Sequence, residues 1–177
     1  MALAHPTPQT VHQPKKAQPL TLRHITQHDN DAINTLIQTI HHEYNLSMDY
    51  TNRDTDLKNI VAYYPPVKSG FWVYENESNQ IVGTGAIQQK SISTAELKRF
   101  YLAKNYRSGG HGQRMMSFLI NFCKQRHYER LVLESHTSQE KAIRFYQTYG
   151  FTEIPIYSQG IPKTYTNIAF ELRLTNQ

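Results

Sequence analysis

Residues 96–120 carry the clearest chemical signature in the chain. An apolar-rich run that predicts a strand leads through an Arg-x-x-Gly-x-Gly turn into a helix, and the turn is formed by Arg107, Gly110 and Gly112. Glycines permit close approach of the backbone, and the first turn of a helix leaves several N–H groups unpaired and carries partial positive charge. The stretch therefore predicts a cradle for a phosphate or a similar anion.

Two better known phosphate motifs do not fit this turn. The chain has no G-x-x-x-x-G-K-S/T, and Met115 stands where a dinucleotide-binding G-x-G-x-x-G needs its third glycine. The cradle thus belongs to neither of these motifs.

The elements that must position the cradle follow from the hydrophobic period. Strands are expected at 20–26, 70–75, 81–88, 94–103, 130–135, 151–156 and 167–174. Helices are expected with buried faces at Ile33, Leu36, Ile37, Ile40 and Tyr44, at Met115, Met116, Leu119, Ile120 and Cys123, and at Ala142, Phe145, Tyr146 and Tyr149, with a short helix at 54–63. Gly150 is placed to end the last helix in a left-handed conformation.

Several local features refine this outline. The alternation along 94–103 loses phase, which predicts a bulge near Lys98 or Arg99. Gly83 and Gly85 indicate close packing of another segment on their strand.

Helix caps and two histidines give further expectations. Thr26 or Asp29 can cap the first helix, and Thr137 with Glu140 has the spacing of a capping box. His41 and His42 are adjacent on a helix, so they cannot bind one metal from one face, and we interpret them as surface residues.

The aromatic segment after the first helix has two interpretations. Its tyrosines can pack a short helix onto the sheet, which we favour, or they can line an acceptor pocket. These residues are Tyr44, Tyr50, Tyr63 and Tyr64.

The length of 177 residues and mass of 20.6 kDa suit one domain with a substantial core. Residues 1–19 contain four prolines and no regular period, so we expect a disordered or loosely docked tail before one domain at 20–177. No apolar run approaches the roughly 20 residues that span a bilayer, and the N-terminus lacks signal-peptide features. The expectations are a cytoplasmic location and no membrane partner, while a homodimer is compatible with the sequence.

Charge and cysteine content limit the functions further. The formal net charge of +5 and the pI near 9.3 favour polyanionic partners in general, but the positive residues are scattered, so no nucleic-acid partner is expected. Cys123 is the only cysteine and falls in a helical core stripe, which indicates a buried thiol. No metal site is expected from the scattered histidines.

Two blocks together resemble one known family. The first is the strand, R-x-x-G-x-G turn and helix of 96–120, and the second is the strand and capped helix of 131–151 with the run A-I-R-F-Y-Q-T-Y-G-F. Their combination, with E-L-K-R-F-Y-L leading into the turn, resembles the GNAT superfamily of acetyl-CoA-dependent N-acetyltransferases over most of the chain from about Leu20. The resemblance implies an α/β (α+β) GNAT fold: a mixed, mostly antiparallel sheet of six to seven strands, helices on both faces, and splayed central strands at 97–102 and 131–135.

The resemblance also implies residues for acetyl-CoA. The main chain of Phe100 and Leu102 would bond the pantetheine arm as an added strand does, and Gln139 stands where many members have Asn. Ser108 and Gly109 differ from the common Gly-Lys, which removes one cation. The turn that would wrap the pyrophosphate comprises Arg107, Ser108, Gly109, Gly110, His111, Gly112 and Gln113.

Catalytic roles follow from the same comparison. Tyr146 matches the family tyrosine that protonates the leaving thiolate, a role suited to a phenol with a pKa near 10. It also belongs to the cofactor-binding set. Glu96 is the first candidate for the base, directly or through water, with Glu134 and His136 as competitors.

The implied function is direct transfer of acetyl from acetyl-CoA to a primary amine of a small molecule or peptide, in a ternary complex and without an acyl-enzyme. The alternative is a non-catalytic CoA-binding regulatory or interaction module. The acceptor amine is left open, because the segments that should shape its pocket are the least patterned of the chain.

Overall fold

The computed structural model describes residues 19–107, 109–157 and 166–174. The tail expected at 1–19 lies outside the described residues except for Pro19, and so does most of the loop expected between the last two strands. The domain boundary at residue 20 stays a prediction.

Seven strands form one sheet in the order β1-β2-β3-β4-β5-β7-β6. Every neighbouring pair is antiparallel except β4 and β5, which run parallel. The mixed, mostly antiparallel sheet is therefore confirmed. The strands are β1 (Thr21–His24), β2 (Gly70–Glu75), β3 (Ile81–Gln89), β4 (Thr94–Leu102), β5 (Arg130–Ser135), β6 (Thr152–Ile154) and β7 (Ile168–Arg173).

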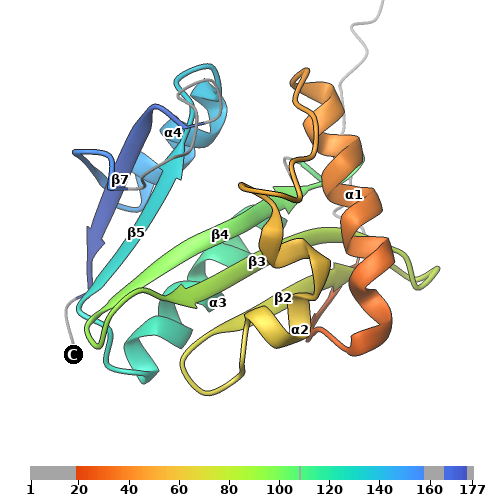
Figure 1. Ribbon diagram of the computed structural model, residues 1–177, viewed down its shortest axis with the longest axis horizontal. Helices are drawn as coiled ribbons and strands as arrows, with labels where there is room; N and C mark the ends of the chain where they lie inside the picture. Colours follow the sequence, from red (N-terminus) through yellow and green to blue (C-terminus); the bar gives the residue numbers. More distant parts are fainter. Residues whose placement is uncertain (1–18, 108, 158–165, 175–177) are drawn as a thin grey trace, which may run out of the picture.

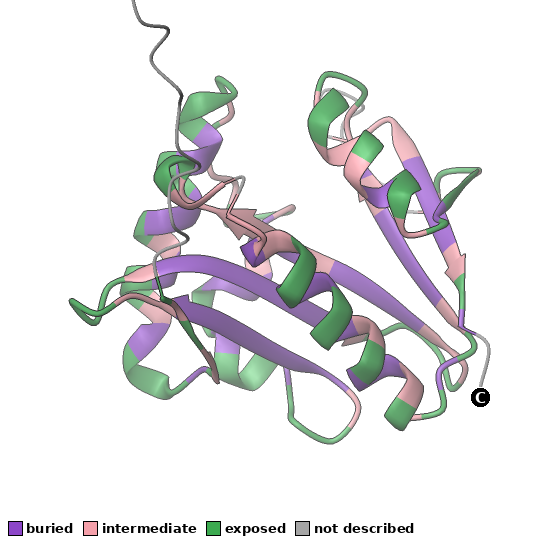
Figure 2. Ribbon diagram, turned by 180° about the vertical axis from the view of Figure 1, so that it is seen from behind, coloured by how far each residue is buried: buried purple, intermediate pink, exposed green. Residues whose placement is uncertain are grey.

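Helices cover both faces of the sheet, as expected (Figure 1). One core joins α1, η2 and α2 to β2 and β3, and a larger core joins α3 and α4 to the opposite face. The helices show buried residues toward the sheet and exposed residues outward (Figure 2). The helices are η1 (Gln27–Asp29), α1 (Asn30–Glu43), η2 (Thr55–Lys58), α2 (Ile60–Tyr63), η3 (Lys104–Tyr106), α3 (His111–Gln125) and α4 (Glu140–Thr148).

The sheet opens between its two central strands. β4 and β5 pair only where residues 94–96 lie beside residues 130–132, and beyond that point the strands diverge (Figure 1). The rest of β4 therefore has β3 on one side and no strand on the other. The predicted splay is confirmed.

A bulge in β4 accounts for its irregular alternation. The register with β3 shifts between Thr84 and Ala86, and Arg99 has φ +52°. The insertion of one residue lets Arg99 reach the α1 side of the sheet, although Leu97 packs on the α3 side. The bulge predicted near Lys98 or Arg99 is confirmed.

Close packing at the β3 glycines is confirmed as well. A Cβ built at Gly85 would lie 2.9 Å from Leu119 Cδ1 and 3.2 Å from Met115 Sδ, so a side chain at this position would force these α3 side chains to move. At Gly83 a Cβ would lie 2.6 Å from Leu102 Cδ2.

Three local expectations were wrong. The helix expected at 54–63 is divided into η2 and α2 because Asn59 adopts φ −150° and its side chain caps α2 by accepting the N–H of Ala62. Thr137 does not cap α4, which begins at Glu140 without a side-chain cap. Instead, the N–H of Thr137 donates to Asn167 Oδ1, and the Thr137 hydroxyl accepts from Asn167 Nδ2. His41 is buried, and only His42 is exposed.

The first helix is entered through a capped 3-10 turn. Thr26 and Asp29 form a capping box around η1, and Asp29 also occupies the N-cap of α1 without a side-chain bond to that helix. Among the described residues, no helix combines the length and the apolar content that crossing a membrane requires.

Candidate active site at the opening between β4 and β5

A cleft of about 580 Å³ occupies the place where β4 and β5 separate. Its walls come from α1, the segment after α1, both central strands, the start of α3 and α4. Of the residues predicted for the site, those that line it are Glu96, Phe100, Leu102, Arg107, Gly112, Gln113, Glu134, His136, Gln139 and Tyr146.

The glycine turn forms one end of this cleft. Gly110 has φ +79°, a conformation that side chains with a Cβ rarely adopt, and it turns the chain into α3. The first helical hydrogen bond runs from the N–H of Arg114 to the C=O of Gly110, so the preceding N–H groups have no partner among the described residues. His111, Gly112 and Gln113 carry these N–H groups, as an anion cradle needs.

Some predicted turn residues do not line the cleft with their side chains. Gly109 and Gly110 are not among its lining residues, and the His111 ring is buried against Tyr74, with centroids 5.7 Å apart. Burial, together with the charge of Arg114, lowers the pKa of His111. Ser108 lies outside the described residues.

The side chain of Arg107 is used within the protein. Its Nε donates to the C=O of Leu102 at 2.8 Å, and its Nη1 lies 2.7 Å from Glu43 Oε2 on α1. Arg107 therefore ties the turn to both the end of β4 and α1.

The open edge of β4 faces the cleft. The N–H of Ala103 donates to Val82 on β3, and since alternate residues address opposite neighbours, the main chain of Leu102 faces the gap. Phe100 stacks on Phe145 of α4 at a centroid distance of 5.7 Å. The N–H of Leu102 thus has no partner among the described residues, while the C=O of that residue is already bonded to Arg107.

Gln139 stands at the start of α4. It is the residue before the helix, and its Oε1 accepts a hydrogen bond from Ser135 Oγ at 3.2 Å. This contact fixes the side chain at the wall of the cleft.

Tyr146 places a phenol on the cleft wall from α4. Its ring is buried and packs against Phe100, Phe151 and Phe170, and its hydroxyl forms no hydrogen bond with another described residue. Burial, with smaller contributions from Tyr101 and Tyr44, raises the pKa of Tyr146 well above its usual value. The phenol is therefore protonated at neutral pH and available to donate.

Glu96 and Glu134 lie on the neighbouring strands β4 and β5, on the side of the sheet that faces α1. Glu96 is buried, and Lys90 Nζ lies 3.4 Å from its Oε2. Tyr157 touches both acids: its hydroxyl donates to Glu96 Oε1 at 3.0 Å, and its main-chain N–H donates to Glu134 Oε1 at 3.1 Å. His136 lies further along and contacts Ser138 Oγ.

The α1 side of the cleft contains residues that the sequence analysis missed. His41 Nε2 lies 3.1 Å from the Tyr101 hydroxyl, and both residues line the cleft. Burial lowers the pKa of His41 to about 4, so the ring is neutral at pH 7. A helical period from Ile33 and Ile37 leads to position 41 and could have shown that this histidine faces inward.

The tyrosines after α1 occupy different environments. Tyr44 lines the cleft, whereas Tyr64 is buried in the core beside Phe71. Tyr50 donates to Asn34 at the surface.

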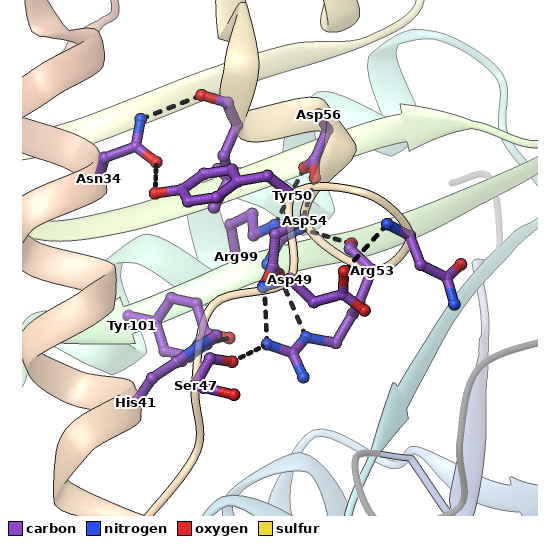
Figure 3. Close-up of polar contacts among 12 residues, drawn as sticks. Asn34, His41, Ser47, Asp49, Tyr50, Arg53, Asp54, Asp56, Arg99 and Tyr101 are labelled. Carbon is purple, nitrogen blue, oxygen red and sulfur yellow. Dashed lines mark hydrogen bonds and ion pairs between the residues drawn. The ribbon is translucent and has the colours of Figure 1, made fainter.

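A buried ion network holds the segment after α1 against β4 (Figure 3). Arg99 Nη1 lies 2.8 Å from Asp54 Oδ1, its Nε donates to Asp56 Oδ2 at 3.0 Å, and its Nη2 bonds Asp56 Oδ1 and the C=O of Arg53. Tyr64 donates its hydroxyl to Asp56. Burial alone would raise the pKa values of both aspartates, but the neighbouring arginines lower them.

The lowered pKa values of three buried aspartates predict that the fold loses stability in acid. Hydrogen bonds from Arg23 lower the pKa of Asp29 to about 2, and the pKa values of Asp54 and Asp56 are also lowered. A pKa below the unfolded value of about 3.9 gives stability that is present above pH ~4 and is lost as pH falls through the folded pKa. We expect the free energy of unfolding, measured by urea denaturation, to fall steeply from pH 5 toward 2.

The Asp29→Asn variant should lose about 2 kcal/mol at neutral pH and show a shallower pH dependence. Asp31→Asn, at an exposed position of α1, is the matched control. Equal slopes in Asp29→Asn and the parent would contradict the assignment.

The described part of the chain contains no cluster of potential metal ligands. No group of three or more His, Cys, Asp or Glu side chains in residues 19–107, 109–157 and 166–174 could hold an ion.

Comparison with known proteins now identifies the fold. The sequence profile described as the Acetyltransferase (GNAT) family matches residues 37–151, which include the cleft from α1 to α4. The chain belongs to this family. The enzyme is thus a GNAT acyltransferase by family and by fold.

One curated N-acetyltransferase and two solved acetyltransferase structures resemble it across most of their length. The uncharacterized N-acetyltransferase YjgM of Escherichia coli (strain K12) is 28% identical over 138 residues, covering 75% of this chain and 82% of that protein. A GNAT acetyltransferase structure from Staphylococcus aureus Mu50 gives a TM-score of 0.81 at 23% identity, covering 89% of this chain and 100% of that one. The Salmonella typhimurium yncA structure, described with its cofactor acetyl-CoA, gives 0.69 at 20% identity, with 90% and 96% covered.

Proposed function

We propose that this GNAT protein transfers the acetyl group of acetyl-CoA directly to a primary amine of a small molecule or peptide, within a ternary complex. The observation that carries the proposal is that one cleft, at the opening between β4 and β5, is lined by a buried carboxylate and a protonated phenol. These are Glu96 and Tyr146.

The cleft suits acetyl-CoA, which supplies an acetyl thioester when bound. The free N–H groups at the start of α3 suit a pyrophosphate, and the unpaired edge of β4 suits an amide-bearing arm. Arg107, His111, Gly112 and Gln113 would hold the phosphates, with Phe100, Leu102, Gln139 and Tyr146 along the arm. The family match and the acetyl-CoA described for the Salmonella typhimurium yncA structure support this choice of donor.

Glu96 and Tyr146 divide the proton transfers. Glu96 accepts a proton from the amine, directly or through a water, so that the nitrogen lone pair can attack the acetyl carbonyl. Tyr146 donates its phenolic proton to the sulfur that leaves. Glu134 and His136 are the alternative bases on β5 and just after it.

A covalent acyl-enzyme is not needed for this route. Cys123 is buried in α3, and burial raises the pKa of its thiol to about 12. The thiol is therefore protonated at neutral pH and does not line the cleft. These properties of Cys123 support direct transfer.

The acceptor would enter from the α1 side, where His41, Tyr44 and Arg53 form part of the wall. The cytoplasmic location and a homodimer stay predictions.

Incubation with acetyl-CoA and a panel of primary amines tests the function. We expect amine-dependent release of free CoA thiol above hydrolysis, and intersecting initial-rate lines when both substrates are varied, as a ternary complex requires. CoA should also slow hydrogen exchange at His111, Gly112 and Gln113. Protection without turnover on any amine would instead support a non-catalytic CoA-binding module.

A further inference from the structure

Tyr157 occupies a position that the proposed chemistry does not yet use. It follows β6, and it is the only described residue that hydrogen-bonds both Glu96 and Glu134. Tyr157 also lines a second cleft of about 530 Å³, and its hydroxyl reaches Glu96, which lines the first cleft.

The two bonds differ in the part of Tyr157 that makes them. The contact with Glu96 Oε1 is made by the phenolic hydroxyl at 3.0 Å, whereas the contact with Glu134 Oε1 is made by the main-chain N–H at 3.1 Å. Replacing Tyr157 by phenylalanine therefore removes the first contact and keeps the second.

The surroundings hold the phenol in place. Lys90 Nζ lies 5.8 Å from the centre of the Tyr157 ring and 3.4 Å from Glu96 Oε2, so Lys90, Tyr157 and Glu96 form one cluster. The lysine reaches one carboxylate oxygen and the phenol reaches the other. Glu96 is thus fixed at both oxygens.

Tyr157 acts as a donor and not as a proton acceptor. Burial, followed by the negative charges of Glu96 and Glu134, raises the pKa of the Tyr157 phenol far above its usual value. The hydroxyl keeps its proton throughout the range in which enzymes are assayed.

We propose that Tyr157 is a positioning residue that holds the Glu96 carboxylate, through the phenolic hydroxyl, in the orientation and charge state that a base requires. The inference rests on the proposed function, since Glu96 must accept the proton of the amine. Tyr157 itself does not touch the reacting atoms.

A hydrogen bond to a carboxylate favours its charged form, which is the form that a base requires. The Tyr157→Phe variant is expected to move the acidic limb of the kcat/KM profile upward by about one pH unit. The charged and titratable groups that surround Glu96 stay in place in this variant: Lys90, Lys98, Glu134, and Tyr64 just after α2.

The experiment compares pH–rate profiles of the parent, Tyr157→Phe and Tyr128→Phe. Tyr128 donates its hydroxyl to the C=O of Lys68 at 2.8 Å and lines neither cleft, so its variant controls for loss of a phenolic hydrogen bond elsewhere. Its profile should match the parent's. The same shift in both variants would overturn the proposal.

A second readout does not depend on turnover. In protein labelled with ¹³C at glutamate carboxyls, the Glu96 signal is assigned from the Glu96→Gln variant, and its titration midpoint should rise in Tyr157→Phe only. If Tyr157→Phe changed neither the NMR titration midpoint of Glu96 nor the pH–rate profile, the proposal would be overturned.

The design also separates the two candidate bases. If Glu134 were the base, Tyr157→Phe would leave the rate profile in place because the main-chain contact survives, and Glu134→Gln would remove the limb. That pair of results would overturn the positioning role. Absence of acetyl transfer with every amine would count against the proposed function instead, and the NMR titration would still decide whether the hydroxyl contact holds Glu96.

Discussion

Tyr146→Phe is expected to lower kcat by about 100-fold or more, with little change in the affinity for acetyl-CoA. The phenol is the only part of the residue that changes, because the ring keeps its packing against Phe100, Phe151 and Phe170. Loss of the proton donor slows departure of the sulfur without removing a contact that binding needs. Steady-state kinetics and calorimetric titration with CoA separate the two effects.

The pH dependence of the parent gives an independent check. Because burial raises the pKa of Tyr146 above its ordinary value of about 10, the donor form persists through the alkaline assay range. No loss of rate below about pH 10 should therefore come from this residue. Tyr128→Phe serves as the control substitution. An unchanged kcat in Tyr146→Phe would show that Tyr146 is not the general acid.

Arg99→Met should cost about 3–5 kcal/mol in the free energy of unfolding, which lowers Tm on the order of 10 °C. The methionine fills a similar volume, but it leaves Asp56 buried without the guanidinium that bonds it, while Asp54 keeps only Arg53, 2.7 Å away. Buried charge without a counter-ion is strongly destabilising. Urea denaturation at pH 7 measures the loss.

A double-mutant cycle provides the control for Arg99. Asp56→Asn alone should also destabilise the fold, and the combination Arg99→Met with Asp56→Asn should lose less than the sum of the two, because each change removes the same pair. Additive losses would show that the residues do not stabilise each other. In the surviving fold, KM for the amine should rise more than KM for acetyl-CoA, because the network anchors the segment after α1.

Local sequence was sufficient to predict the cradle and most elements. The R-x-x-G-x-G spacing places Gly110 where a positive φ is required, and the phase loss at Lys98 and Arg99 reports the bulge directly. Both are properties of a few consecutive residues. Gly150 is a third case, since φ +85° follows the end of α4 as expected.

The contacts that shape the acceptor side could not be read in the same way. Arg99 meets Asp56 across 43 positions and Tyr157 meets Glu96 across 61, and no periodicity links such residues. The broken helix at Asn59 arose from a side-chain cap that competes with helix propensity. Sequence spacing does not reveal these pairs of polar groups, because only the folded sheet brings them together.

The gap between β4 and β5 gives this protein an edge in the middle of its sheet. Outer edges are where unpaired N–H and C=O groups recruit a strand from another molecule, and proteins protect them with bulges, charges or covering elements. The inner edge has two such features: a bulge at Arg99, and Phe145 stacked on Phe100. Side chains at the site are therefore placed where they limit pairing of a foreign strand with β4.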